Sequence, residues 1–250
     1  MLASPLMPFV ASLALFQGTS DPIRQASQLD LEGKGPAARE LLRKAIDTAP
    51  DGRSRANAER SMAMSWGFEG NCAKTGEYEQ KVIDHWVTQE QADPGNAFYQ
   101  EGEMADEAAR VCIDAGELDA AAQWYRKGHD LGLKEPGVFA DRKALWAFRW
   151  EHAQARIGAR RGNRAEAEKH VAAARSALEK MTQLRRQQEA FLPYLTGLCR
   201  LLSGRLQSGA GRPEERQPGR PVHPVPPRAD LRKAGRPGER AGSISESGVE

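Results

Sequence analysis

The chain has 250 residues, of which 28% are charged and 6% aromatic, and its net charge is +2. So small a net charge creates no field that would attract a polyanion, which argues against a nucleic-acid partner. Ala, Glu, Lys, Arg and Gln are plentiful, and alternating runs of β-branched residues are missing. We therefore expect an all-α protein.

Residues 1–20, MLASPLMPFVASLALFQGTS, are apolar and carry no charged side chain. This run is too short, and too interrupted by Pro5 and Pro8, to supply the roughly 20 helical residues that span a bilayer. It resembles the apolar part of a secretory signal that lacks the usual basic segment, with small residues at 18–20 near a cleavage point. We expect an exported or periplasmic protein. The alternative is a cytoplasmic protein whose residues 1–20 pack on the first helices.

From Pro22 the chain repeats a unit of two short amphipathic helices around a Gly, here called helix A and helix B of a hairpin. In the first hairpin, helix A covers about 22–32 and helix B about 36–48, with Gly33 between them. Pro50 stops helix B, because proline cannot continue a helix. Small or apolar residues that let the two helices pack fall at Ala26, Ala38, Leu42 and Ala45.

The same spacing recurs further along the chain. The third hairpin turns at Gly116, with Ala109, Ala121, Tyr125 and Gly128 in the matching places. The fourth turns at Gly162, with Ala155, Ala167, Val171 and Ala174. Such hairpins cannot bury their apolar faces alone, so the units are expected to stack.

Two other units match less well. In the second hairpin only Gly76 holds the register, and Glu69 and Lys81 stand where small residues belong. A fifth helix A covers about 193–203, has Gly197 in the small position, and is expected to end at Gly204.

Together, this set of Ala, Gly, Leu/Tyr and Pro positions resembles the tetratricopeptide repeat (TPR) family over residues 22–204. The units are longer than the 34-residue TPR unit, so a more general helical-repeat array is the alternative. The resemblance implies a helix-hairpin repeat array, a TPR-like superhelix that holds a protein or peptide in a concave groove lined by the A helices.

Carried onto the better-matching units, the resemblance implies a peptide-binding surface on two A helices. Its residues would be Glu103, Asp106, Arg110, Arg149, His152, Arg156 and Arg160. An acidic stretch beside a basic one would suit an extended peptide of mixed charge, since arginine grips carboxylates in fork geometry. The alternative is an ordinary solvated helix face. The Asn residues of carboxylate-clamp TPR proteins are absent at these places, so a chaperone C-terminus is not indicated.

Catalytic and cofactor motifs are missing. The five His residues form neither HExxH nor another metal-ligand spacing, and no phosphate-binding glycine loop follows a strand. Cys72, Cys112 and Cys199 are expected to be buried as small apolar residues, or, in an exported chain, Cys72 and Cys112 to form a disulfide. We therefore expect a non-catalytic scaffold without a cofactor. The alternative is a regulatory or sensor subunit of a multi-protein system.

The composition changes after Gly204, and seven of the chain's 15 prolines follow it. A Pro/Arg-rich segment without apolar periodicity predicts a disordered tail over 205–250, whose functional versions would be a polyproline ligand or a basic arm. We favour a frameshift. A one-base shift from Arg205 onward permits Asp-Tyr-Lys-Ala-Ala-Leu-Ala, which would begin the helix B that the fifth helix A lacks.

Overall fold

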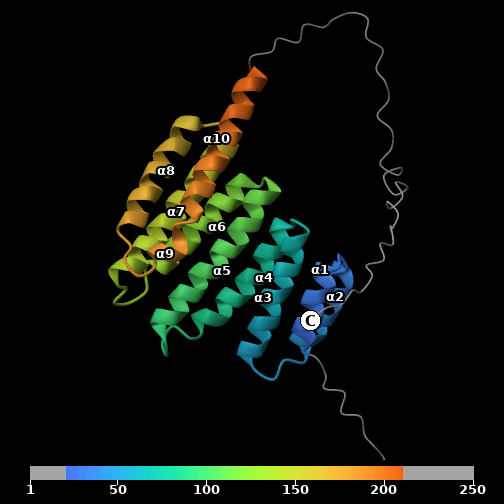
Figure 1. Ribbon diagram of the computed structural model, residues 1–250. Helices are drawn as coiled ribbons and strands as arrows, with labels where there is room; N and C mark the ends of the chain where they lie inside the picture. Colours follow the sequence, from blue (N-terminus) through green and yellow to red (C-terminus); the bar gives the residue numbers. More distant parts are fainter. Residues whose placement is uncertain (1–20, 211–250) are drawn as a thin grey trace, which may run out of the picture. The chain divides into compact units, whose positions relative to one another are not determined.

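The computed structural model describes residues 21–210, and this part of the chain is a series of helices joined by short connections (Figure 1). The helices are α1 (Pro22–Leu31), α2 (Gly35–Asp47), α3 (Gly52–Phe68), α4 (Cys72–Val87), α5 (Pro94–Ala115), α6 (Leu118–Gly132), α7 (Ala140–Arg160), α8 (Arg164–Glu179), α9 (Arg185–Gln188) and α10 (Phe191–Ala210). Residues 21–210 contain no strand, so the all-α prediction is confirmed. The expected signal segment 1–20 and the tail from 211 onward lie outside the described residues.

The helices pack in chain order as a helix-hairpin array, as predicted. The hairpins are α1–α2, α3–α4, α5–α6 and α7–α8, and each packs on the next, while α10 lies against α7 and α8 (Figure 1). The core is a row of apolar clusters, most of which join neighbouring hairpins. This agrees with units that cannot bury their apolar faces alone. None of the helices in residues 21–210 is long and apolar enough to cross a membrane.

Several helices begin where an Asp or Asn side chain satisfies a backbone N–H of the first turn. This acceptor binds one of the donors that a helix start leaves without an intrahelical partner. The capping residues are Asp21, Asp51, Asn71, Asp93 and Asn163.

Glycines close the hairpins in the left-handed conformation, where a residue without Cβ is favoured. Gly33, Gly116 and Gly162 have φ values of 74°, 87° and 77°, as their predicted role at the turn requires. In the second hairpin the turn glycine is Gly70, with φ 69°, and the prediction of Gly76 is wrong. Gly76 lies inside α4, where a Cβ would come within 3.0 Å of the Trp124 indole.

Counting from Gly70 brings the second hairpin into register with the others. Its small positions are Ala63 and Thr75, both fully buried, and not Glu69 and Lys81. They match Ala26 and Ala38, which lie at the same distances from Gly33. The large apolar position, occupied by Leu42 and by Tyr125 in other hairpins, holds Glu79 here. The second unit is therefore a regular hairpin with a buried carboxyl group in its core.

The last helix departs from the prediction at its end. α10 continues through Gly204 to Ala210, so Gly204 does not close it. Gly197 is exposed, and nothing lies within 4 Å of the place where its Cβ would stand. The equivalent residues Ala63, Ala109 and Ala155 are fully buried. Gly197 thus occupies a helix-A position that no second helix covers in the described part of the chain.

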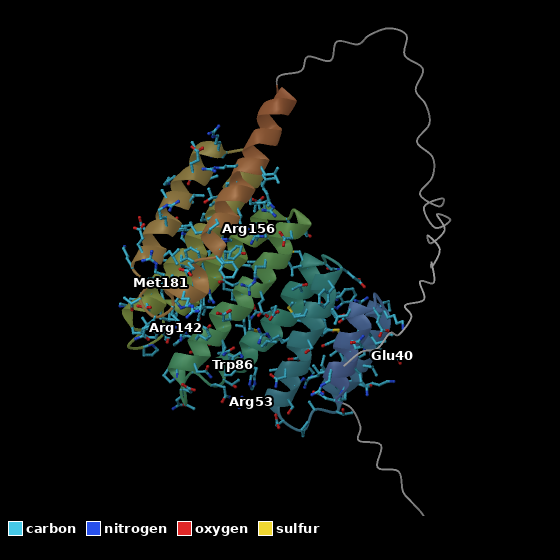
Figure 2. The ribbon with its side chains drawn as sticks, in the orientation of Figure 1. Glu40, Arg53, Trp86, Arg142, Arg156 and Met181 are labelled. Carbon is cyan, nitrogen blue, oxygen red and sulfur yellow. A yellow bond between two sulfur atoms is a disulfide. The ribbon has the colours of Figure 1, made fainter. Side chains whose placement is uncertain are left out.

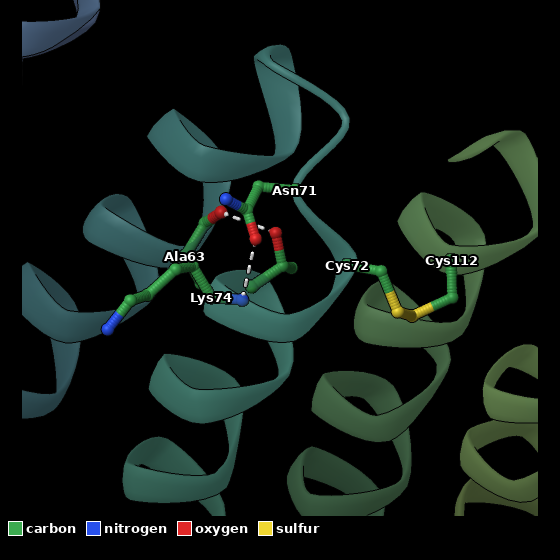
Figure 3. Close-up of a disulfide and its surroundings, with 6 residues drawn as sticks. Ala63, Asn71, Cys72, Lys74 and Cys112 are labelled. Carbon is green, nitrogen blue, oxygen red and sulfur yellow. Dashed lines mark hydrogen bonds between the residues drawn. A yellow bond between two sulfur atoms is a disulfide. The ribbon is translucent and has the colours of Figure 1, made fainter. Parts of the chain in front are cut away.

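A disulfide joins Cys72, the first residue of α4, to Cys112 in α5 (Figure 3). It links the second hairpin to the third, and both cysteines also belong to the apolar cluster between them. Cys199 is buried and free. All three cysteines are therefore buried, as expected, but Cys199 alone is a free thiol, and the disulfide alternative describes the other two.

Candidate functional site

A cavity of about 280 Å³ lies among α5, α6, α7 and the α9–α10 segment. Five of the seven predicted site residues line it: Asp106, Arg110, Arg149, His152 and Arg156. We call it the arginine cavity; one of its lining residues, Arg156 on α7, is labelled in Figure 2. The other two predicted residues lie outside its lining: Glu103 forms an ion pair with Arg149, and Arg160 forms one with Asp114.

The loop before α9 is fixed by one carboxylate at the start of α7. Asp141 accepts hydrogen bonds from the backbone N–H groups of Thr182, Gln183 and Leu184, and from the Thr182 hydroxyl. The backbone donors hold the pKa of this carboxyl below its usual value. This clamp ties the 182–184 segment to α7, and the segment leads into α9 and α10, which supply one wall of the arginine cavity.

In and around the cavity, five guanidinium groups share three ion-pairing carboxylates. Arg149 pairs with Glu103, whose carboxylate oxygen lies 2.5 Å from a guanidinium nitrogen. A single carboxylate, Asp114, serves both Arg156 and Arg160, at 3.0 and 2.9 Å. The nearest ion-pair contact of Arg110 is Glu107 at 3.9 Å. That carboxylate also accepts from Arg60, so it is shared.

Asp106 is the acidic group inside the cavity. Its side chain is buried, and one of its oxygens lies 2.5 Å from the place where a Cβ on Gly128 would stand. Burial raises its pKa to about 7, against the opposing effect of Arg149 and Arg110. Near neutral pH a substantial fraction of Asp106 is therefore protonated, which leaves the cavity with still less negative charge.

His152 adds a neutral, hydrogen-bonding ring. Burial lowers its pKa to about 4, and Arg156 and Arg110 lower it further. Its Nε2 is buried and has no hydrogen-bond partner within the described residues. The ring is stacked on Tyr194, with centroids 6.3 Å apart, and contacts Phe148 at 5.9 Å. At neutral pH His152 thus offers a ring nitrogen to a ligand without adding charge.

Sequence reasoning did not identify the other residues of the lining. They are Tyr125, Phe148, Gln188, Phe191 and Tyr194. The hydroxyl of Tyr125 lies 3.4 Å from a guanidinium nitrogen of Arg156, which donates to it, and burial raises the pKa of this tyrosine to about 12. Tyr194 could have been found, because it lies as far before Gly204 as Asp106 lies before Gly116 and His152 before Gly162.

The described residues define a class of protein, a helix-hairpin array with one cationic cavity that has aromatic walls. Within residues 21–210 no group of three or more His, Cys, Asp or Glu side chains is placed to hold a metal ion. Comparison of the chain with protein-family models, with curated proteins and with solved structures finds no match.

Proposed function

We propose that this protein is a non-catalytic scaffold that binds an acidic segment of a protein or peptide in the arginine cavity. The observation that carries the proposal is that two carboxylates beside the cavity are shared between arginines: Asp114 serves Arg156 and Arg160, and Glu107 serves Arg110 and Arg60. Carboxylate groups of a partner would supply the missing charge, and arginine binds them in two-point geometry.

The rest of the lining suits the same ligand. The aromatic rings of Phe148, Phe191 and Tyr194 offer apolar surface to the aliphatic stem of a glutamate. His152, neutral and with a free ring nitrogen, can form a hydrogen bond to a peptide group. A partner with several acidic side chains therefore finds both charge and packing in one cavity.

Fluorescence anisotropy with the full chain tests this proposal. The probe is a labelled peptide with four consecutive Glu residues, and its matched control has four Gln residues. We expect only the Glu peptide to bind. Arg110→Gln should weaken that binding about fivefold, the upper range for a partly exposed ion pair. Arg110 is the variant of choice because about half of its side chain is exposed and its own ion pair is long.

The control variant is Arg175→Gln, on the exposed surface of α8. It removes the same charge at a distance from the cavity and should leave the affinity unchanged. Equal binding of the Glu and Gln peptides would refute the proposal. So would an effect of Arg175→Gln as large as that of Arg110→Gln, because the attraction would then be non-specific.

We further propose that the hairpins are divergent tetratricopeptide repeats. Four turn glycines in one register support this, with small residues seven positions before each: Ala26, Ala63, Ala109 and Ala155. The uncovered Gly197 supports the view that a further helix B belongs after α10, as the frameshift hypothesis requires. Resequencing the codons around Gly204 tests that hypothesis, and an undisturbed reading frame would reject it.

We propose that the protein is exported from the cytosol. The Cys72–Cys112 disulfide supports it, because disulfides persist in oxidising compartments such as the periplasm and are rare in the cytosol. The measurement is the mass of the mature protein from its native host. Loss of the first 20 or so residues, together with one disulfide, is the expected result; an intact, fully reduced chain would reject export.

A further inference from the structure

The A helices present equivalent residues on one side of the array, at fixed distances before the turn glycines. Six residues before the glycine stand Ser27, Met64, Arg110 and Arg156. Two residues before it stand Leu31, Phe68, Asp114 and Arg160. The first two hairpins thus carry small or apolar residues where the third and fourth carry charges.

The apolar residues surround a second cavity, of about 520 Å³, among α1, α2, α3 and α5. Leu31 is 75% exposed, Phe68 63% and Met64 39%. Three large apolar side chains exposed around one hollow are unusual on a surface that stays in water, and such patches mark binding sites. We call this hollow the apolar cavity.

The two cavities are neighbours along α5. Glu107 lines the apolar cavity, and the adjacent Asp106 lines the arginine cavity. Between them, Arg60 on α3 donates to Glu107, and Arg110 lies one turn further along α5. Arg60 and Glu107 neutralise each other, which leaves Asp30 as the remaining charged side chain of the apolar cavity. The surface therefore changes from apolar, without excess positive charge, to cationic across one helix.

We propose that the apolar cavity binds an apolar side chain of the same partner segment whose acidic residues enter the arginine cavity. This inference rests on the proposed function. The occupant is an extended peptide segment with a leucine-like residue separated from an acidic group. Charge complementarity at one end and exposed apolar surface at the other select this chemistry over a purely acidic or a purely apolar ligand.

Geometry sets the separation of the two features in the ligand. Ion pairs join α5 to both α3 and α7, so two steps of about 10 Å give roughly 20 Å between α3 and α7. An extended segment covers that distance with about six residues at ~3.3 Å each. The ligand should thus carry its apolar residue about six positions from its acidic group.

Anisotropy with paired peptides tests the inference on the full chain. One peptide has four Glu residues and a Leu six positions away, and its control has Ser in place of that Leu. Two such pairs are made, one with the Leu or Ser before the Glu block and one with it after the block. In one of the two directions we expect Leu to improve binding about tenfold, the effect of burying one such side chain. Phe68→Gln should remove this advantage and leave the binding of the Ser peptide unchanged. Leu133→Gln, at an exposed leucine in the α6–α7 connection, is the control and should change nothing.

The outcomes separate the two proposals. If Glu peptides bind no better than Gln peptides, the arginine cavity fails and this inference fails with it. If Glu peptides bind but Leu gives no advantage in either direction, only this inference is refuted. Self-association that Phe68→Gln abolishes, without an effect on peptide binding, would assign the apolar cavity to a second copy of the chain and would also refute it.

Discussion

The first two hairpins and the next two share one backbone register but differ in what they present to a partner. The inner positions, seven residues before and five after each turn glycine, hold small residues throughout, among them Ala63, Thr75, Ala109 and Ala121. The outer position six residues before the glycine changes from Met64 to Arg110 and Arg156. Helix packing therefore constrains one set of positions and leaves the other free to determine the ligand.

The cores of the two regions differ as well. The second hairpin buries Glu79 where its neighbours have large apolar side chains, and both carboxyl oxygens lack a hydrogen-bond partner within the described residues. The third hairpin instead uses glycines to admit Trp146, which is fully buried. The buried Glu79 lowers the stability of the second hairpin, whereas the third hairpin depends on close packing around Trp146. The two regions should therefore respond differently to mutation.

The disulfide should have the largest effect, because it is the covalent link between these regions. Cys72 and Cys112 are separated by 40 residues. Closing a loop of that size stabilises a fold by about 4 kcal/mol in the chain-entropy account. Reduction should therefore lower the free energy of unfolding by about this amount, measured by urea denaturation with and without a reductant. The double variant Cys72→Ala/Cys112→Ala is the control, and a response of this variant to the reductant would contradict the assignment.

Gly132→Ala should destabilise the third hairpin next most. A Cβ at Gly132 would lie 2.1 Å from the Trp146 indole, which is fully buried. Overpacking of this kind costs about 3 kcal/mol. Thermal unfolding measures it, with Gly95→Ala in the first turn of α5 as the control, because nothing lies within 4 Å of that position. Equal losses in the two variants would show that the contact with Trp146 is unimportant.

Glu79→Leu should stabilise the second hairpin. Burial holds the pKa of Glu79 far above its usual 4.5, and the nearby Glu107 raises it further. The folded state then keeps a proton that the unfolded state has lost, so stability falls as pH rises above about 4.5. Replacing the carboxyl group with leucine removes this penalty and should add on the order of 2 kcal/mol at pH 8.

Urea denaturation at pH 5 and pH 8 checks the change at Glu79. The wild-type chain should lose stability between these values, and Glu79→Leu should lose less. Glu79→Gln is the matched control: it cannot ionise, so it should show the smaller pH dependence without the gain from apolar packing. A wild-type chain and a Glu79→Gln variant with the same pH dependence would contradict the assignment of the proton to Glu79.

Sequence patterns predicted the hairpins because glycine turns and small packing residues are local requirements. They misplaced the second turn because that unit offers three nearby glycines, Gly67, Gly70 and Gly76, and has a carboxyl group at its apolar position. The cationic side of the cavity followed from the resemblance and the register. Of its aromatic wall, Tyr194 was within reach of the same register, but Phe191 was not, because its place depends on contacts distant in sequence, such as the Asp141 clamp.

The smallest effect should come from Asp106, within the arginine cavity. Burial raises its pKa to about 7, so a fall in pH through 7 adds a proton and removes a negative charge from the cavity. The affinity for the Glu peptide should therefore rise about threefold from pH 8 to pH 6, the order expected for one screened charge. Peptide carboxylates stay ionised over this range, and His152, with its pKa near 4, stays neutral.

Asp106→Asn isolates this contribution, since it removes the titrating group with little change in shape. The variant should bind the Glu peptide at pH 8 as tightly as the wild-type chain does at pH 6, and its affinity should hardly change with pH. Asp47→Asn, at the exposed end of α2, is the control and should keep the wild-type profile. Loss of a distant charge would shift the affinity by the same factor at every pH. A flatter plot of affinity against pH in Asp106→Asn, but not in the control, therefore assigns the titrating group to the arginine cavity. A pH profile that is the same in Asp106→Asn and in the wild-type chain would instead assign the titration to another group.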